Sequence, residues 1–555
     1  MVNTTVPETA IILTAYIENC LNTRRKPSGG EIIALLLNGA EKSAEFFCIK
    51  ETEELIYFKE DTNKYSTEGK EMVHSFCEAV LRNSNAVQYA HTSPIMEVEN
   101  HIRRNSYVSM EEFDKEPLTL LPLANGIYDL ETGELLPYSA EHRFLNTLAV
   151  AFNPEAKCPN FEMFLDDVCV DNEMKPDLKM RQSIIQLFAY TLWRGFPIQN
   201  VFFLIGGGAN GKGVLLGTLQ AMLGNDNVAN RSILALSDNR FAGADLHRKH
   251  ANISNELTVD EVDNVDLLKS LVSGTDYISA ERKHQQPFTF MNYAKIIIAT
   301  NAPPKANDAT DGFYRRLNLI RFTRQFFGVD DKKDLPTKLK QPEELSGILN
   351  LALAELRLWL REDGFNPEST FANYMPVDEM RVLYERLADS VSAFRYDCLD
   401  ITQEEDDYVV KDDMFKAYRN YCVNKKVGAN TEAKFWREFR TQTIGTIMEK
   451  RIGSAKIRAF AGVVLKDDKT PTKEAKVSGY PSNPPLAAIK QSNTLEQSIK
   501  LDGYHNTKVL ILKDLPIWVG VDGKTYGTYK KGEIMELPVK EVAFLLSYGL
   551  CRIVL

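Results

Sequence analysis

A glycine-rich turn between an apolar run and a helical pattern is the feature that most constrains the fold of this chain. The segment reads Val201-Phe-Phe-Leu-Ile-Gly-Gly-Gly-Ala-Asn-Gly-Lys-Gly213, and helical spacing of apolar residues follows over 214–223. Glycines allow successive backbone N–H groups to turn towards one point, and the amino end of a helix adds partial positive charge. Lys212 would then reach the β- and γ-phosphates of a nucleotide. This order predicts a phosphate-binding loop, with an ordinary strand-to-helix turn as the alternative.

The nucleotide-binding residues that this loop predicts are contiguous. They are Gly206, Gly207, Gly208, Ala209, Asn210, Gly211, Lys212, Gly213 and Val214. Gly213 occupies the position where a Ser or Thr hydroxyl usually binds Mg²⁺. Either other groups and water hold the metal, or the site binds nucleotide without fast hydrolysis.

The composition limits the classes of protein to which the chain can belong. With 555 residues it is too long for one compact core, so several domains are expected. A content of 44% hydrophobic and 26% charged residues is typical of a globular protein. The net charge of −10 argues against uniform coating of nucleic acid, but it leaves room for a local basic channel.

Cysteine usage and hydropathy predict the compartment. The cysteines form no Cys-x-x-Cys pair, so neither a zinc site nor a disulfide framework is expected, and a reducing environment is the default. The first residues lack a signal-peptide pattern, and no apolar run is long enough to span a bilayer. We therefore expect a cytoplasmic protein without a membrane partner.

Short periodic patterns predict the elements on both sides of the loop. Residues 1 to about 110 alternate strand-like and helical patterns, with paired strands over 45–50 and 54–60 and a helix over 69–81. Further predicted elements are a hairpin around the turns Asn125-Gly126 and Thr132-Gly133, helices near 180–194, 344–360, 410–421 and 435–439, and a strand pair within 458–466.

A carboxylate follows the next apolar strand pattern after the loop. The segment 249–256 predicts a short strand that ends near Glu256. A carboxylate opposite the phosphates can orient or deprotonate the attacking water and support Mg²⁺, directly or through water. Glu256 is therefore the predicted catalytic acid and metal-binding residue, with a solvated residue at a helix start as the alternative. Asn255 precedes it, so direct protein ligands for the metal are few.

Two later segments add polar groups at strand ends. Residues 295–300 predict a buried strand beside the phosphate-loop strand, which would place the Asn301 amide near a γ-phosphate. Arg315 and Arg316 stand just before another predicted strand. An arginine at a subunit edge can stabilise transition-state charge in the site of a neighbouring subunit.

A basic tip lies between two short strand patterns within 278–290. The tip consists of Arg282, Lys283 and His284. Positive side chains on a hairpin can grip phosphates without reading sequence, so we expect these three residues to bind DNA.

Taken together, residues 45 to 466 resemble the superfamily 3 helicase core of AAA+ ATPases, of the phage and plasmid primase–helicase type shared with poxviruses. The four ATPase motifs stand in the order and spacing of that family, and Asn125-Gly-Ile-Tyr-Asp-Leu-Glu-Thr-Gly-Glu134 and Cys158-Pro159 match upstream of them. By this resemblance Lys212 is the Walker A lysine, Glu256 the Walker B acid and Asn301 sensor 1. Arg316, with Arg315, is the trans-acting arginine finger, and the basic tip is the DNA-contacting hairpin of a central channel.

The resemblance implies a multidomain α/β protein with an AAA+ P-loop ATPase core. The expected domains are an N-terminal α+β region (1–110), a helicase-associated module (111–194), the ATPase core (195–330), a helical lid or connector (331–407), a winged-helix-like domain (408–466), a linker (467–498) and a small β-rich domain (499–555). Basic residues of the winged-helix-like domain could hold duplex DNA, or could be a solvated helix face: Lys434, Arg437, Arg440, Lys450, Arg451, Lys456 and Arg458.

The last fifty residues carry a second resemblance. Strand patterns near 509–512, 517–521 and 526–529 surround the order Gly-x-Asp-Gly-x-x-Tyr-Gly-x-Tyr-Lys-Lys-Gly, and an apolar run follows over 542–546. This order is similar to the small β-domain of archaeal GINS replication proteins. It implies an archaeal mobile element and a module that docks replication partners; a generic β-barrel-like tail is the alternative.

The expected function is that of an ATP- and Mg²⁺-dependent replicative DNA helicase of a virus or plasmid. The resemblance implies a hexameric ring that moves 3′ to 5′ on single-stranded and forked DNA. An ATP-binding replication initiator or loader with little hydrolysis is the alternative, because of Gly213 and Asn255. A small-molecule kinase would leave the paired arginines without use. We expect no primer synthesis, since only about 45 residues precede the recognisable module.

Overall fold

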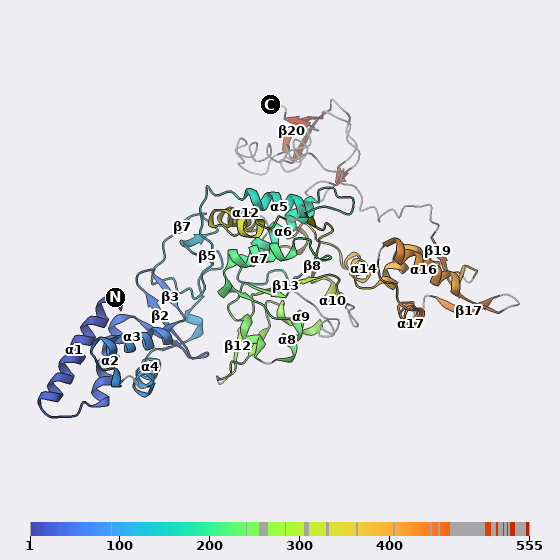
Figure 1. Ribbon diagram of the computed structural model, residues 1–555. Coiled ribbons are helices and arrows are strands. Elements are labelled where there is room, and N and C mark those ends of the chain that lie inside the picture. Colours follow the sequence, from blue (N-terminus) through green and yellow to red (C-terminus); the bar gives the residue numbers. More distant parts are fainter. Residues whose placement is uncertain are drawn as a thin grey trace. The chain divides into compact units, whose positions relative to one another are not determined.

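The computed structural model divides the chain into two compact units, residues 1–463 and 464–555, and each is described by itself (Figure 1). The structure describes residues 2–89, 92–239, 241–254, 265–283, 285–304, 310–328, 332–361, 364–402, 404, 406–425, 427–443, 447–452, 456–466, 506–511, 518–519, 525–526, 530, 533–538 and 551–553. Helices and several sheets are mixed throughout, as expected for an α/β protein.

The N-terminal part of the first unit packs four helices against a small sheet. The helices are α1 (Val2–Asn22), α2 (Gly29–Ser43), α3 (Gly69–Asn83) and α4 (Thr92–Asn105), and the strands are β1 (Phe46–Ile49), β2 (Glu54–Lys59), β3 (Lys64–Ser66) and β4 (Tyr107–Val108). The predicted strand pair and the helix over 69–81 are confirmed. The first 43 residues, for which no individual element was predicted, form two helices. The continuous apolar run 32–37 does not distinguish a buried strand from a buried helix.

A five-stranded parallel sheet forms the centre of the unit. Its strands are β8 (Val201–Ile205), β9 (Val228–Ala229), β10 (Ala251–Ser254), β13 (Lys295–Thr300) and β14 (Leu317–Arg321). They lie in the order β14-β8-β13-β10-β9. All residues of β8 and β13 are buried, as the continuous apolar runs of a parallel sheet require. The prediction that the strand before Asn301 lies beside the phosphate-loop strand is therefore confirmed.

Helices from distant parts of the sequence share one hydrophobic core with this sheet. They are α5 (Pro159–Val168), α6 (Leu178–Leu192), α7 (Lys212–Leu223) and α12 (Pro342–Arg361). In Figure 1, α12 lies along α6, and it also contacts α5 and α7. The predicted hairpin near residue 126 is a meander of β5 (Leu120–Leu123), β6 (Gly126–Asp129) and β7 (Leu135–Leu136). Shorter elements are α8 (Ile233–Asp238), α9 (Val265–Leu271), α10 (Asp311–Tyr314), α13 (Pro367–Thr370) and β15 (Leu399–Ile401).

The end of the first unit has its own aromatic core. It contains α14 (Val377–Ala388), α15 (Ser390–Cys398), β16 (Tyr408–Val410), α16 (Lys411–Lys425), α17 (Glu432–Gln442), β17 (Met448–Ile452) and β18 (Ile457–Ala461). The three strands form an antiparallel sheet in the order β16-β18-β17, and Trp436 stacks on Phe460 with ring centroids 5.1 Å apart. The prediction that two strands within 458–466 pair with each other is wrong. β18 pairs instead with β17, a largely exposed strand that precedes this segment.

The second unit is described only as strands. β20 (Asn506–Ile511) pairs antiparallel with β23 (Ile534–Pro538) and β24 (Cys551–Ile553), and β21 (Trp518–Val519) pairs with β22 (Thr525–Tyr526). The predicted apolar run over 542–546 lies outside the described residues. Within the ranges given above, no helix combines the length and the apolar character needed to cross a membrane.

We predict that Gly347→Ala destabilises the unit although alanine is the better helix former. The helix preference favours the variant by about 0.5–1 kcal/mol. An added Cβ in α12 would, however, lie 2.6 Å from the backbone nitrogen of Cys158, and overpacking of this kind costs about 1–3 kcal/mol. Urea unfolding followed by circular dichroism measures the sign. The control is Gly30→Ala in α2, where the nearest atom would be 3.8 Å away and no destabilisation is expected.

Candidate functional site

The turn between β8 and α7 has the shape of a phosphate-binding loop. Ala209 and Gly211 have positive φ angles of 55° and 89°. At Gly206 an added Cβ would overlap the side chain of Asn210 and the carbonyl oxygen of Phe322. Gly211 is therefore required for its backbone conformation, and Gly206 because a side chain would not fit. Helix α7 begins at Lys212, with the positive end of its dipole towards the loop.

Lys212 is folded back over this loop. Its Nζ donates to the carbonyl oxygen of Gly206 at 2.5 Å and to Oδ1 of Asn210 at 3.2 Å. The residue is only 9% exposed, and burial lowers the pKa of its ammonium below the usual value. Because phosphate oxygens are stronger acceptors than amide carbonyls, a nucleotide phosphate can replace these loop oxygens as partners of the ammonium.

A cavity of about 660 Å³ adjoins the loop and extends along α7. Three segments that are distant in sequence add to the loop residues in its lining: α5, the chain after β14, and α11 (Leu335–Lys338). The added residues are Phe164, Asp167, Phe326, Lys332, Leu335, Pro336 and Lys340, while Gly217 lines the cavity from α7. Its aromatic and aliphatic groups suit the base and ribose of a nucleotide, and its lysines suit phosphates. None of these added residues was predicted, because no local pattern links the three segments.

The chain that follows β14 holds the loop in place. The backbone N–H of Phe326 donates to the carbonyl oxygen of Ala209 at 2.7 Å, and the Gln325 amide donates to that of Gly208 at 2.9 Å. Asp167 of α5 accepts from Lys332 at 2.8 Å and lies 3.6 Å from the guanidinium of Arg324. These contacts join both sides of the cavity.

Asn301 lies at the same edge of the sheet as the loop. The backbone N–H of Gly206 donates to the carbonyl oxygen of Thr300 at 3.1 Å, and Asn301 is the next residue, with an exposed side chain. β10 runs parallel to β13, so its carboxyl end also meets this edge. Asn255 and Glu256 follow β10 but lie outside the described residues.

Arg315 and Arg316 lie at the opposite edge of the same sheet. The carbonyl oxygen of Arg316 accepts from the N–H of Val201, the first residue of β8. At about 3.3 Å per residue, the five residues of β8 separate the two edges by roughly 16 Å. Neither arginine can therefore contact phosphates held by the loop of its own chain.

The two arginines differ in their surroundings. The guanidinium of Arg316 is half-buried and donates to the carbonyl oxygen of Gly312 at 2.5 Å and to Oε1 of Gln199 at 2.8 Å. Burial, with the nearby charge of Arg315, lowers the pKa of Arg316. Arg315 is exposed. Arg316 thus fixes the start of β14, and Arg315 extends from it into solvent.

The predicted basic tip closes an antiparallel hairpin of β11 (Tyr277–Ala280) and β12 (Phe288–Met291). The Arg282 guanidinium lies over the Phe288 ring at 5.4 Å, and Lys283 is exposed. His284 lies outside the described residues. At the base of the hairpin, burial first, then the charges of Arg248, Arg282 and Lys249, lower the pKa of His247 to about 2. Three basic side chains, Arg248, Lys249 and Arg282, therefore lie near the base of the hairpin.

The described residues fit a nucleoside triphosphate better than they fit its metal ion. They supply Lys212, the loop backbone and the amino end of α7 for phosphates. Gly213 supplies no side-chain oxygen, and the only carboxylate among the lining residues, Asp167, is already paired. Within the described part of the chain, no group of three potential ligands could hold a metal. Glu256, the predicted metal ligand, lies outside the described residues.

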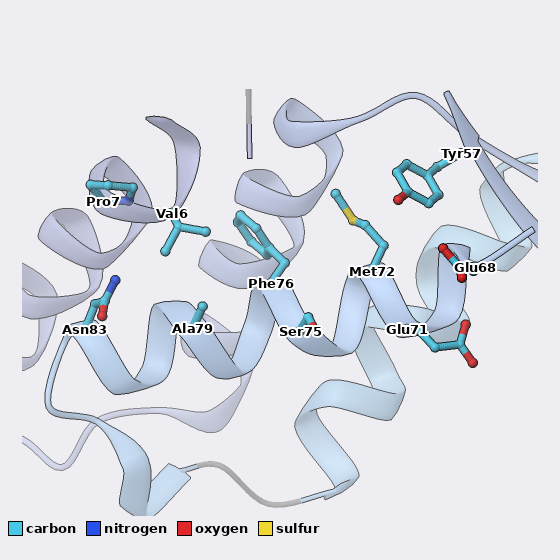
Figure 2. Close-up of a pocket in the computed structure, with 10 residues that line it drawn as sticks. All are labelled: Val6, Pro7, Tyr57, Glu68, Glu71, Met72, Ser75, Phe76, Ala79 and Asn83. Atoms are coloured by element: carbon cyan, nitrogen blue, oxygen red, sulfur yellow. The ribbon is translucent and has the colours of Figure 1, made fainter. Parts of the chain in front are cut away.

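A second cavity, of about 600 Å³, lies in the N-terminal part and shares no lining residue with the first. Figure 2 shows Met72 and Phe76 along α3, with Val6 of α1 across from them. Glu68 and Glu71 lie at one end of α3, and Lys59 pairs with Glu68 at 3.3 Å. This is an apolar groove with an acidic end, unlike the cavity beside the loop, which is lined by lysines.

Two protein-family models match the chain. A model described as D5 N terminal like matches residues 41–170, and a model of a family of unknown function (DUF5906) matches residues 204–316. The first covers the meander and α5, and the second covers the sequence from the end of β8 to the paired arginines.

Similar curated proteins come from two viruses. The chain is 25% identical over 260 residues to "Putative primase C962R" of African swine fever virus, covering 45% of this chain and 26% of that protein. It is 24% identical over 352 residues to "Putative helicase L207/L206" of Acanthamoeba polyphaga mimivirus, covering 58% of this chain and 34% of that protein. The chain thus spans between a quarter and about a third of the length of these relatives.

Among solved structures, the apo NrS-1 C terminal region aligns over 79% of this chain and 100% of that chain. The TM-score is 0.41 and the sequence identity 13%. At the level of sequence, the chain is therefore similar to viral proteins named as primase and helicase, and residues 41–170 match the D5 N-terminal-like family.

We predict that Gly206→Ala weakens nucleotide binding by about tenfold or more, because the Asn210 side chain and the chain at Phe322 must move to admit the methyl group. Gly208→Ala is the matched control in the same loop. An added Cβ there would have no atom within 4 Å, so we expect its affinity to stay within about threefold of the wild type. Titration with a fluorescent ATP analogue measures both; equal losses would contradict the steric role of Gly206.

Proposed function

We propose that the chain is an ATP-dependent replicative DNA helicase of a virus or plasmid that works as a homo-oligomeric ring, expected to be a hexamer. The observation that carries this proposal is the division of charged groups between the two edges of one parallel sheet. Lys212 and Asn301 lie at the carboxyl edge, and Arg315 and Arg316 at the amino edge. One chain therefore holds two complementary halves of a catalytic site that cannot meet within it.

In the proposed site, Lys212 and the loop backbone bind the β- and γ-phosphates of ATP, and Asn301 contacts the γ-phosphate. Glu256 is proposed to orient the attacking water and to support Mg²⁺, which neutralises developing phosphate charge when it is bound. Arg315 of the neighbouring subunit reaches the γ-phosphate, and Arg316 positions it through Gly312 and Gln199. An arginine supplied in trans couples hydrolysis to assembly of the ring.

The hairpin is the proposed contact with single-stranded DNA. Arg282 and Lys283 carry its charge in the described residues, and His284 is proposed to join them. Arg248 and Lys249 near the base of the hairpin add positive charge that attracts a phosphate backbone. Movement of the hairpin with hydrolysis would carry the strand through the ring, 3′ to 5′ by the family resemblance.

The region from α15 to β18, which has its own aromatic core, is proposed to be a winged-helix domain that contacts duplex DNA. Its order of helix, strand, two helices and two strands supports this assignment. In the β17–β18 hairpin Arg451 lies directly opposite Arg458, and both are exposed. Like charges in this position destabilise a strand pair unless an anion lies between them, and a DNA phosphate would serve.

The similarity to viral proteins named as primase and helicase supports a role in DNA replication. The small β-domain is proposed to dock replication proteins, as its resemblance to archaeal GINS implies. The alternative is an ATP-binding initiator or loader with little hydrolysis of its own. The observation that favours it is the absence of a side-chain oxygen at Gly213, with Glu256 as the remaining candidate metal ligand.

Hydrolysis of ATP with and without single-stranded DNA tests the proposal. We expect stimulation by DNA in the wild type and loss of at least about 100-fold in Lys212→Ala, because the lysine neutralises the transferred phosphate. The charge reversal Lys338→Glu, outside the cavity, is the control and should keep the rate. Binding of ATP without turnover would favour the initiator or loader instead.

Mixed oligomers test the arginine in trans. We expect Lys212→Ala and Arg315→Ala each to lose hydrolysis alone, and an equal mixture to recover roughly a tenth or more of the wild-type rate. The mixture contains interfaces where an intact loop from one variant meets an intact arginine from the other. An equal mixture of Arg316→Ala with Lys212→Ala should recover less hydrolysis, because the loss of Arg316 loosens the start of β14. No recovery in any mixture would exclude the trans arrangement.

A further inference from the structure

Two glycines leave one strip of α7 without side chains beside the phosphate loop. Gly213 is exposed, and an added Cβ would have no atom within 4 Å. Gly217 stands four residues later and so lies on the same face of the helix. An added Cβ at Gly217 would lie 3.4 Å from the Nζ of Lys340. The Lys340 ammonium thus lies against this strip, one helical turn from the position where phosphate-binding loops usually carry a metal-binding hydroxyl.

Lys340 is anchored by its backbone and free at its tip. It follows α11, whose Leu335 and Pro336 line the same cavity, and the preceding Leu339 is fully buried. Its own side chain is exposed, and no ion pair involves it within the described part of the chain. The long flexible stem of a lysine allows the ammonium to move along the strip towards the loop.

Lys332 and Asp167, the other two charged residues that line the cavity beyond the loop, already form ion pairs. Lys332 donates to Asp167 at 2.8 Å, and the same carboxylate faces Arg324. Gly213 offers no oxygen to a metal ion. Among the described residues, the ammonium of Lys340 therefore has no ion-pair partner. It lies near the position where similar sites hold a metal ion through a hydroxyl group.

We propose that Lys340 supplies positive charge to the bound phosphates of the nucleotide, so that nucleotide binding by this chain depends little on Mg²⁺. This inference rests on the proposed function, since it concerns the same nucleotide site. Binding and hydrolysis then have separate requirements. The ammoniums of Lys212 and Lys340 hold the triphosphate, and the metal is needed only for turnover, together with Glu256.

The test is the dissociation constant of a fluorescent ATP analogue for the full chain, in excess Mg²⁺ and in excess EDTA. For the wild type we expect the two values to agree within about threefold. Lys340→Ala should bind at least about tenfold more weakly than the wild type in EDTA and lose less in Mg²⁺. Lys340→Arg should keep binding in EDTA, because it retains the charge.

Lys338→Ala is the matched control. It removes the same charge two residues away, but Lys338 pairs with Asp334 at 2.6 Å and does not line the cavity. Its affinity should equal that of the wild type in both buffers. Gly213→Ser adds a hydroxyl in open space and should make binding tighter in Mg²⁺ than in EDTA.

The outcomes separate this inference from the proposed function. Wild-type binding in Mg²⁺ that disappears in EDTA would overturn the inference and leave the nucleotide site intact. Equal behaviour of Lys340→Ala and Lys338→Ala in EDTA would overturn it as well. Absence of binding in both buffers would instead overturn the proposed function itself.

Discussion

The parallel pairing of β8 with β13 and β14 is the constraint on which the rest of the site depends. Ile205 lies opposite Thr300 on one side and Arg321 on the other. The phosphate loop, Asn301 and the chain that closes the loop therefore leave the sheet at one level. A shift of register in either pair would displace one of them from this edge.

Local charge, rather than net charge, determines where this chain can attract polyanions. The protein carries a net charge of −10. Nevertheless the cavity beside the loop brings together Lys212, Lys332 and Lys340, and the hairpin carries Arg282 and Lys283 at its tip. Steering by such fields falls off within about 10 Å at 0.1 M salt. Acidic residues elsewhere therefore do not cancel them.

The same sheet also keeps two groups of predicted site residues apart within one chain. Its two edges are separated by the length of β8, so the loop and the paired arginines cannot meet in one chain. In the proposed ring, head-to-tail contacts would bring the loop of one subunit to the arginines of the next. Within the pair, Arg316 is held by two hydrogen bonds and Arg315 is exposed, a difference that residue type alone does not give.

The sequence by itself determined the elements whose pattern is local: the loop between a buried strand and a helix, the hairpin with its basic tip, the strand before Asn301 and the amphipathic α12. It did not determine β17, because an exposed strand has no apolar alternation to detect. Only the tertiary structure brought Lys340 to the cavity beside the loop and distinguished the surroundings of Arg315 and Arg316. The physical reason is that these properties arise from contacts between segments far apart in the chain, which no periodicity records.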